Sequence, residues 1–397
     1  MKFTGVIEGF YGRPWSLSQR KKLINQFTEF GGLNTYIYAP KDDFKHRQKW
    51  RELYSVTELQ EISQIVEICK NNNVNFIYAI APGIDISYSS SNDFNYLSLK
   101  LNQILRLGVE GAAILFDDIP EQFCDEDKKK YNSFAQAQAE ISNKLMENIN
   151  TDNWFFCPTV YCSDQTKGSL EKNDYLQELS NSLHVEFNLF WTGPNVVSPE
   201  INLVHVKELK SIFQNPIVIW DNIFANDYDL HRCFMGPFSG REEIKDEIAG
   251  ILLNPNCEFE LNFIPIKTFS DFCQGGREES YQNAQTEWYT QFEECISLDE
   301  LQLLIEVFHL PHKFGKKGNE VVALLKSNKF DKLAQNSWDI LQKLAHMEYR
   351  KLFHSIYPYA WELYYLIKKC KEGTEIELLP QTRDGSLVFR LEKLKKS

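Results

Sequence analysis

Residues 111–118 read GAAILFDD, an apolar run that ends in two adjacent aspartates. Near-continuous apolar character of this kind is typical of a strand that is buried on both faces of a parallel sheet. Seven similar runs occur elsewhere, separated by helical patterns. They begin at Phe3, Leu33, Val74, Trp154, Glu186, Pro216 and Ala249. Eight strand–helix units, which start 30 to 43 residues apart, predict a closed parallel (β/α)8 barrel, an α/β fold of the TIM-barrel type.

The stretches between these runs carry helix start and stop signals. Ser16 precedes a helical pattern that Gly31 and Gly32 end, and Ser55 with Glu58 forms a capping box. The eighth strand has a competitor, because CEFELNF at 257–263 also alternates like a strand. We prefer AGILLN, from Ala249, since Asn254-Pro255 ends it as the other strands end.

The chain is long enough for a second domain. About 250 residues is typical of such a barrel, which places the barrel domain at residues 1–270. A polar segment follows, and Ser297 with Glu300 makes another capping box. We therefore predict a linker at 271–296 and a smaller all-α helical domain at 297–397.

Composition and charge exclude several classes of protein. The 397 residues have a net charge of −12 and no basic stripe, so nucleic acid is a poor partner. No apolar run is long enough for a membrane span, and Met1 leads directly into a predicted strand without a leader. The nine Cys form no C-x-x-C pair, which fits thiols in a reducing compartment. We expect a cytoplasmic protein and leave the nucleus open.

Polar side chains follow the predicted strands, where a barrel of this type carries its reacting groups. The adjacent carboxylates Asp117 and Asp118 repel each other, so one can act as an acid while the other stays ionised. A solvated turn or a helix cap is the alternative explanation of this pair. His309 and His312 lack a third ligand, so we expect no metal. No nucleotide, dinucleotide, esterase or zinc-protease motif occurs, and we expect no cofactor.

Several motifs, in order along the barrel, carry a resemblance to a known family. They are GVIEGFYGRPW at 5–15, NTYIYAPKDD at 34–43, FIYAIAPGIDI at 76–86, LFDDI at 115–119, FCPTVYC at 156–162, LFWTGPNVVS at 189–198, VIWDNIFANDYD at 218–229 and NPNCEFELN at 254–262. Together they resemble the catalytic domain of the O-GlcNAcases, glycoside hydrolase family 84. The resemblance implies a (β/α)8 barrel that hydrolyses β-linked N-acetylglucosamine from Ser and Thr with retention.

The resemblance also implies a mechanism and its residues. In this family the substrate's own 2-acetamido oxygen attacks the anomeric carbon, an exception to the usual two-carboxylate geometry. By motif, Asp117 would orient the acetamido group and Asp118 would be the general acid/base. Sugar hydroxyls would be held by Gly9, Lys41, Asp227 and Asn254. The acetamido pocket would be lined by Cys157, Tyr161, Trp220 and Asn222.

One position departs from the family pattern. Val160 stands where the animal-type sequences carry Glu. If Val160 and Tyr161 lie on one strand, their side chains point to opposite faces. We therefore expect little effect on the chemistry.

The predicted helical domain at 297–397 resembles the helical stalk of the animal-type enzymes, without the acetyltransferase-like domain. The segments that carry this likeness are 299–318 and 357–369. The resemblance implies a homodimer through this domain, with Trp361 near the partner's cleft, and O-GlcNAc-modified proteins as substrates. By their helical spacing, Phe353, Tyr357 and Tyr364 are better explained as core.

Three other functions stay open from the sequence. The first is a β-N-acetylglucosaminidase that acts on glycans or hyaluronan fragments. The second is a catalytically silent glycan-binding protein, although silencing usually removes the acid and Asp118 is present. The third is a scaffold whose helical domain binds partners.

Overall fold

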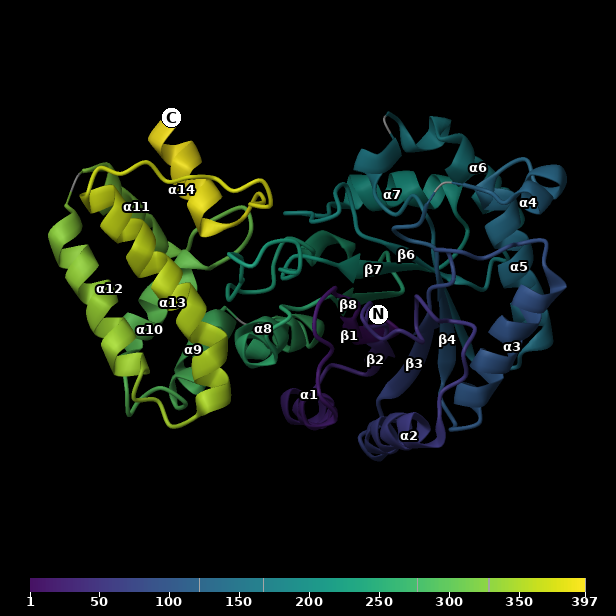
Figure 1. Cartoon of the computed structure of the whole chain (residues 1–397), viewed down its shortest axis with the longest axis horizontal. Helices are drawn as coiled ribbons and strands as arrows, with labels where there is room; N and C mark the ends of the chain where they lie inside the picture. The colour runs from purple at the N-terminus through teal and green to yellow at the C-terminus, as the bar shows by residue number, and fades with distance from the viewer. Residues whose placement is uncertain (121, 167, 277, 328, 397) are drawn as a thin grey trace. The chain divides into compact units, whose positions relative to one another are not determined.

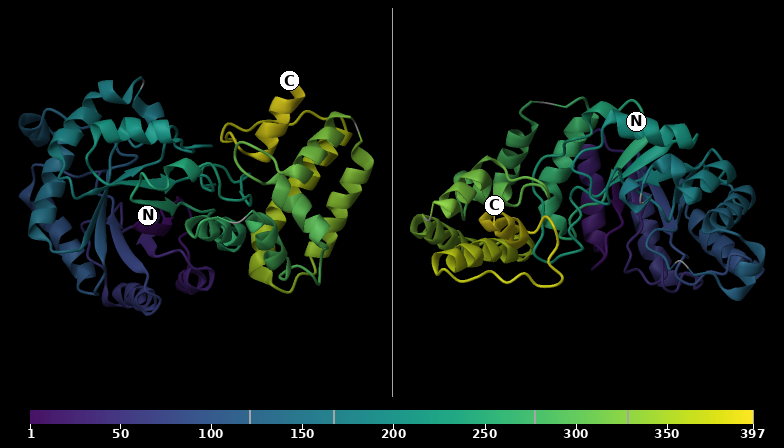
Figure 2. Two further views of the ribbon diagram at one scale, coloured as in Figure 1. Left: turned by 180° about the vertical axis from the view of Figure 1, so that it is seen from behind. Right: turned by 90° about the horizontal axis from the view of Figure 1, so that it is seen from above.

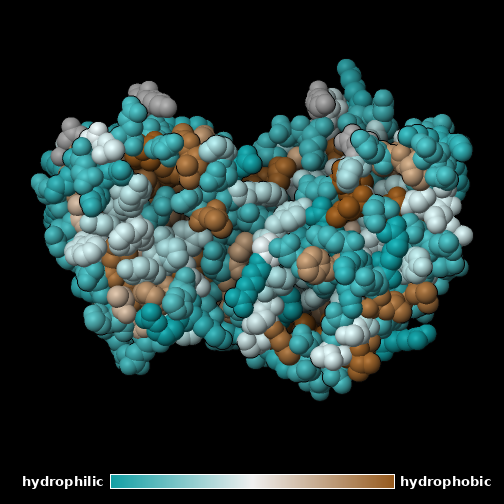
Figure 3. Space-filling view, viewed as in Figure 1, coloured by the Kyte–Doolittle hydropathy of each residue, from teal (hydrophilic) through white to brown (hydrophobic). Residues whose placement is uncertain are grey.

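The computed structural model describes residues 1–120, 122–166, 168–276, 278–327 and 329–396, so residues 121, 167, 277, 328 and 397 lie outside it. Backbone contacts divide the chain into two compact units. The first unit comprises Met1–Asn222 and Ser239–Asn254. The second comprises Ile223–Phe238 and Pro255–Ser397. The face drawn in Figure 3 is mostly hydrophilic with scattered apolar residues, in keeping with the charged composition.

The first unit is a closed barrel of eight parallel strands in sequence order, with β1 paired to β8. This confirms the (β/α)8 fold predicted from the sequence (Figure 1). The strands are β1 (Phe3–Glu8), β2 (Thr35–Tyr38), β3 (Asn75–Ile80), β4 (Gly111–Leu115), β5 (Asn153–Cys157), β6 (Asn188–Trp191), β7 (Ile217–Asp221) and β8 (Gly250–Leu253). Each falls on one of the eight runs, and the preferred eighth strand is correct.

Side chains two residues apart on each strand fill the barrel interior, as the alternation of a strand requires. On β4 these are Ala113 and Leu115, and on β7 they are Val218 and Trp220. After five of the strands, the residue two positions beyond the last interior residue is a site candidate. They are Gly9 after Ile7, Lys41 after Ala39, Asp117 after Leu115, Asn222 after Trp220 and Asn254 after Leu252. The interior register therefore leads directly to the candidate site.

Helices pack on the outside of the barrel (Figures 1 and 2). They are α1 (Leu17–Phe30), α2 (Val56–Asn71), α3 (Ser91–Leu105), α4 (Asp125–Lys130), α5 (Phe134–Asn148), α6 (Asp174–Ser182) and α7 (Leu203–Ile212). The capping box predicted for Ser55 with Glu58 is present at the start of α2, and a second capping box, of Ser16 with Gln19, begins α1. Gly31 ends α1 with φ of 79°, a conformation that favours glycine.

The second unit is helical, with α8 (Phe263–Cys273), α9 (Ser280–Tyr289), α10 (Leu298–Val307), α11 (Lys316–Lys326), α12 (Phe330–Leu344), α13 (Arg350–Lys371) and α14 (Leu387–Lys396). The capping box predicted at Ser297 is present at the start of α10. Residues 257–263, the rejected strand candidate, contain the 3-10 helix η4 (Phe259–Asn262). None of the helices in the described ranges is both long and apolar enough to cross a membrane.

The boundaries of this unit differ from those predicted. The segment 271–296, predicted as a linker, includes the helix α9 and belongs to the second unit. Residues 223–238, after β7, also belong to it, because Met235 and Gly236 donate backbone hydrogen bonds to the carbonyls of Phe308 and His309. Sequence spacing cannot reveal such a pairing between distant segments.

The core of the second unit gathers apolar residues from α9 to α14. Tyr359 is buried in it, and Phe353, Tyr357 and Tyr364 pack against it half-buried, in agreement with their predicted core position. Trp361 and Tyr365, by contrast, keep 45% and 44% of their surface exposed. The helix α13 therefore has both a core face and an exposed aromatic face.

Candidate active site

The strongest candidate for a reacting group is Asp117, which follows β4 and is 8% exposed. The Nζ of Lys41 donates a hydrogen bond to its Oδ2. Burial raises the pKa of Asp117, but the charge and hydrogen bond of Lys41, helped by the charge of Arg47, outweigh burial and hold this pKa below its ordinary value. The carboxylate is therefore ionised at neutral pH.

The other oxygen of Asp117, Oδ1, is buried and has no hydrogen-bond partner among the described residues. Buried polar atoms are nearly always paired in folded proteins. An ionised oxygen without a donor is therefore ready to accept one from a ligand. An amide N–H is a donor of the right kind.

Asp118, the neighbouring carboxylate, lies in a different environment. It is exposed, and both of its oxygens accept hydrogen bonds from tyrosines. The Oη of Tyr161 lies 2.9 Å from Oδ1, and the Oη of Tyr11 lies 3.0 Å from Oδ2. Asp118 can exchange protons with solvent or ligand, whereas Asp117 is held in one state. The two aspartates are thus suited to different tasks.

Gly9 and Trp220 meet at the carboxyl ends of β1 and β7. A Cβ placed on Gly9 would lie 2.3 Å from Cζ2 of the Trp220 ring, a distance that no real side chain allows. Trp220 is 5% exposed, so its ring cannot easily move away. Lys41 Nζ lies 5.5 Å from the centre of the same ring. Gly9, Lys41 and Trp220 thus form one wall of the site.

Cys157 and Tyr161 belong to the same interior cluster as Trp220. Burial, with an addition from the charge of Asp117, raises the pKa of the Cys157 thiol well above its ordinary value. This thiol stays protonated and acts as a small apolar group rather than a nucleophile. Because β5 ends at Cys157, Val160 is not on a strand, and the predicted argument that its side chain points away from that of Tyr161 is wrong.

Two asparagines complete the part of the site in the first unit. The Nδ2 of Asn254 donates to Oδ1 of Asn222 at 2.9 Å, and Nδ2 of Asn222 donates to the carbonyl of Val196 at 2.9 Å. The Oδ1 of Asn254 is buried and without a partner among the described residues, like Oδ1 of Asp117. Asp227 lies in the second unit, so its predicted contact with the sugar stays a prediction.

Other carboxylates at the strand ends are structural. Arg20 donates to both oxygens of Glu8 at 2.8 and 2.7 Å. Arg241 donates to both oxygens of Asp221 at 2.6 and 2.8 Å, and both side chains are fully buried. These pairs hold the loops around the barrel mouth and leave no oxygen for a ligand.

Two residues at the site were not predicted from the sequence. Tyr11 lies within the EGFYG motif, two residues after Gly9, and its contact with Asp118 had no signal beyond that motif. Arg47 lies in the loop after β2, and its Nη2 donates to the carbonyl of Asp118 at 2.9 Å. Arg47 lies too far from the end of β2 to be predicted from its position after a strand.

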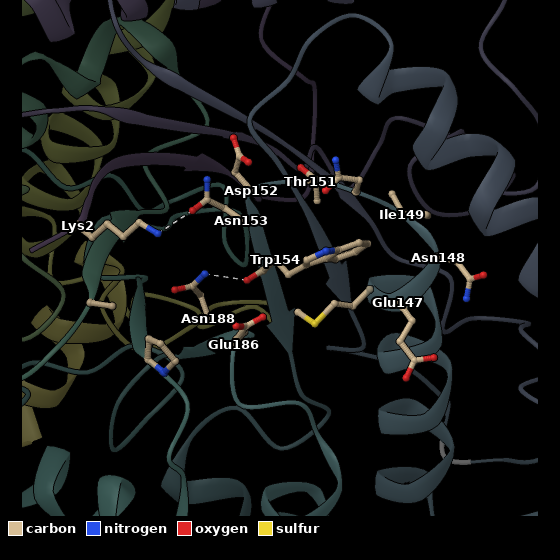
Figure 4. Close-up of a pocket in the computed structure, with 14 residues that line it drawn as sticks. Lys2, Glu147, Asn148, Ile149, Thr151, Asp152, Asn153, Trp154, Glu186 and Asn188 are labelled. Atoms are coloured by element: carbon tan, nitrogen blue, oxygen red, sulfur yellow. Dashed lines mark hydrogen bonds between the residues drawn. The ribbon is translucent and has the colours of Figure 1, made fainter.

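A cavity of about 660 Å³ lies at the opposite end of the barrel, near the amino ends of the strands (Figure 4). Its polar groups bind the chain itself. Lys2 Nζ donates to Oδ1 of Asn153 at 2.9 Å, and Nδ2 of Asn188 donates to the carbonyl of Trp154 at 2.8 Å. None of its described lining side chains has a buried atom without a partner. Since barrels of this type react at the carboxyl ends of their strands, we assign this cavity no catalytic role.

Comparison with known proteins identifies the family of this chain. The family model of the β-N-acetylglucosaminidases (NAGidase) matches residues 4–308. The protein O-GlcNAcase of Rattus norvegicus is 44% identical to this chain over 268 residues, and that of Mus musculus is 43% identical over the same length. These alignments cover 67% of this chain, which spans 29% of the length of these curated relatives.

The solved structure of a mutant of the Thermobaculum terrenum O-GlcNAc hydrolase is also similar. The superposition has a TM-score of 0.79 with 27% sequence identity, and it covers 94% of this chain and 83% of the other. The similarity therefore extends beyond the barrel into the helical part of the chain.

Proposed function

This chain belongs to the β-N-acetylglucosaminidase family, and from that premise we propose that it is a retaining glycoside hydrolase that removes O-linked N-acetylglucosamine from Ser and Thr of intracellular proteins. The observation that carries this proposal is the pair of adjacent carboxylates in unlike environments. Asp117 is buried, paired with Lys41 and has one oxygen without a partner. Asp118 is exposed and can gain and lose a proton.

In the first step the acetamido oxygen of the substrate attacks the anomeric carbon. Asp117 accepts the acetamido N–H at its unpartnered Oδ1 and balances the positive charge that develops on the oxazoline ring. Asp118 gives its proton to the leaving oxygen of Ser or Thr as the bond to the sugar breaks. Lys41 keeps Asp117 ionised throughout.

In the second step Asp118 removes a proton from water. This water attacks the anomeric carbon from the face of the sugar from which the Ser or Thr oxygen departed. Two inversions give net retention of configuration. Because the nucleophile belongs to the substrate, the carboxylates need not be placed on opposite sides of the sugar. Two adjacent residues that follow one strand are therefore sufficient.

The rest of the site supports an N-acetylated sugar. Cys157, Tyr161 and Trp220 belong to one apolar cluster and, with Asn222, would line the pocket for the acetamido methyl group. Asn254 has a free acceptor for a sugar hydroxyl, and Lys41 is a donor. By the family motifs, Gly9 would bind a sugar hydroxyl through its backbone and Asp227 through its carboxylate.

We also propose an intracellular location and a homodimer through the helical unit. All nine cysteines are free, which suits a reducing compartment. The exposed Trp361 and Tyr365 on α13 and Trp338 on α12, with 45%, 44% and 38% of their surface exposed, offer an aromatic surface of the kind found at protein interfaces. In such a dimer Trp361 would lie near the partner's cleft.

Turnover of an aryl β-N-acetylglucosaminide, followed by turnover of an O-GlcNAc-modified protein, tests the proposal. We expect both substrates to react, the first-formed sugar to be the β-anomer by NMR, and a thiazoline analogue of the oxazoline to inhibit competitively. Chelators should leave the rate unchanged. Turnover of free glycans but not of the modified protein would favour a glycan-trimming enzyme, and no turnover at all would favour a binding protein or scaffold.

A further inference from the structure

Arg47 is a buried cation whose charge supports the ionised form of Asp117, but whose hydrogen bonds the reaction described above does not explain. Its side chain lies in the loop between β2 and α2, and the residue is 8% exposed. Within the described ranges no carboxylate forms a salt bridge with it, unlike Arg20 and Arg241, which each hold both oxygens of a carboxylate. Burying a guanidinium without a carboxylate is unfavourable. The fold therefore places this charge at the site at some cost.

The donors of Arg47 converge on Asp118. Its Nη2 donates to the backbone carbonyl of Asp118 at 2.9 Å, and its Nη1 donates to Oη of Tyr11 at 2.5 Å. Tyr11 in turn donates to Oδ2 of Asp118 at 3.0 Å. One guanidinium thus fixes both the backbone and, through Tyr11, the carboxylate of the same residue.

The backbone of Asp118 needs such support. Its φ is +49°, in the left-handed region that residues other than glycine rarely adopt. A conformation of this kind persists only where the surroundings hold it. The bond from Arg47 to the Asp118 carbonyl is a contact of this type.

The hydrogen bonds that reach Asp118 through Tyr11 run in one direction. A guanidinium can only donate, so the Tyr11 oxygen accepts from Arg47 and the Tyr11 proton is donated to Asp118. Burial and the charge of Asp118 raise the pKa of Tyr11, so this hydroxyl keeps its proton. Tyr161 donates to the other oxygen at 2.9 Å. Two donors are therefore directed at the two oxygens of Asp118 and fix the orientation of this side chain.

We propose that Arg47, acting through Tyr11, is a positioning residue for the second half of the reaction, in which Asp118 acts as the base. This inference rests on the proposed function. In that step the water oxygen forms a bond to the anomeric carbon, and the bond from this carbon to the former acetamido oxygen breaks. The electron pair returns to the amide, and the water proton goes to Asp118. Asp118 must be ionised and correctly aimed when the water arrives.

The two half-reactions can be measured separately. The oxazoline of N-acetylglucosamine, supplied as a substrate, needs only the second step. An aryl glycoside with a good leaving group needs little acid help, and its kcat/KM reports the first step. We expect Arg47→Met and Tyr11→Phe to lower kcat/KM for the oxazoline about tenfold, the usual effect of one lost hydrogen bond at a charged group. For the aryl glycoside we expect a change of about twofold or less.

The variants Arg47→Lys and Arg51→Met provide the controls. Lys at position 47 can replace one of the two bonds, so it should recover part of the oxazoline activity. Arg51 lies in the same loop but binds Asp85 and Asp93. Arg51→Met should therefore change kcat/KM for the oxazoline and for the aryl glycoside by the same factor. Tyr11→Phe removes only a hydroxyl and keeps the test valid if Arg47→Met does not fold.

The outcomes are distinct. A selective loss on the oxazoline, with partial recovery by Arg47→Lys, supports the assignment. Equal losses on both substrates, or an unchanged oxazoline rate in Tyr11→Phe, overturn it while the proposed function stands. A wild-type protein that turns over neither substrate overturns the proposed function and this inference with it.

Discussion

The ion pair between Lys41 and Asp117 leads to a quantitative prediction for the variant Lys41→Met. The substitution removes the cation and keeps a side chain of similar length in the buried wall beside Trp220. Asp117 then keeps the burial that raises its pKa and loses the charge and hydrogen bond that lower it. Breaking a buried pair of this kind costs about 3 to 5 kcal/mol.

This loss of free energy converts into a shift on the pH axis. A tenfold change in a protonation equilibrium corresponds to about 1.4 kcal/mol, so the pH at which activity is lost with the charge of Asp117 should rise by about two to four pH units. In the wild-type protein the pKa of Asp117 is depressed, so its charged form persists as pH falls until that lowered value is reached. In Lys41→Met the charge, and the activity that depends on it, should be lost at a higher pH.

The assay is kcat/KM for an aryl β-N-acetylglucosaminide measured across the pH range. We expect the acidic limb of the wild-type profile to be due to Asp117. In Lys41→Met the acidic limb should move up by about two to four pH units, and the maximum should fall because a sugar contact is lost.

The variant Lys45→Met is the matched control. Lys45 lies in the same loop but pairs with Glu58 at 2.6 Å, so its loss should leave the acidic limb in place. A Lys41→Met profile that is lower at every pH but has an unmoved acidic limb would show that Asp117 does not depend on Lys41. Our account of the site would then be wrong.

Three further predictions concern other parts of the molecule. Asp118→Asn should lose about 10² to 10⁴ in rate on substrates with poor leaving groups and much less on a good aryl leaving group, whereas Asp117→Asn should impair both; the reverse pattern in kcat/KM would exchange the two roles. Gly9→Ala should lower kcat/KM at least about tenfold and reduce the melting temperature, because its Cβ would overlap the Trp220 ring; wild-type values of both would contradict this. Trp361→Ala should weaken the dimer in light scattering and reduce turnover of a modified protein more than of an aryl glycoside, and a wild-type protein that is monomeric at micromolar concentration would exclude the dimer.

Point substitutions are better tests of the helical unit than a deletion of residues 297–397. The core of this unit includes Cys233 and Met235, which precede β8 in the sequence, together with residues of α10 and α13. A deletion from residue 297 would expose these apolar side chains. Loss of activity in such a truncation would report unfolding rather than a role in substrate binding.

The barrel could be predicted because its strands are buried on both faces. Sequences such as GAAIL and IVIWD leave no polar face, so length and spacing were enough to locate all eight strands. The boundary of the second unit could not be predicted in this way. It depends on backbone bonds between the loop that contains Met235 and the residues after α10, and neither segment has a pattern that identifies the other.

The candidate site was predicted where a strand leads into it and missed where a loop does. Lys41, Asp117 and Asn254 continue the interior alternation of their strands, so their positions follow from the register. Arg47 binds Asp118 from the middle of a loop. Loops have no regular alternation of buried and exposed positions, so the burial of Arg47 could not be predicted. The roles of the individual residues came from the family resemblance and not from the periodicity.

The adjacent aspartates illustrate what the structure adds to the sequence. On a regular strand, neighbouring side chains point to opposite faces, so Asp117 and Asp118 could not both serve one site. The chain leaves the extended conformation at Asp118, where φ is +49°, and the Asp118 carboxylate meets Tyr161, which lies in the same interior cluster as Trp220. Asp is among the few residues that tolerate this conformation. An aspartate at position 118 therefore meets two requirements. It supplies the carboxylate, and it tolerates the backbone turn that brings this carboxylate to the same side as that of Asp117.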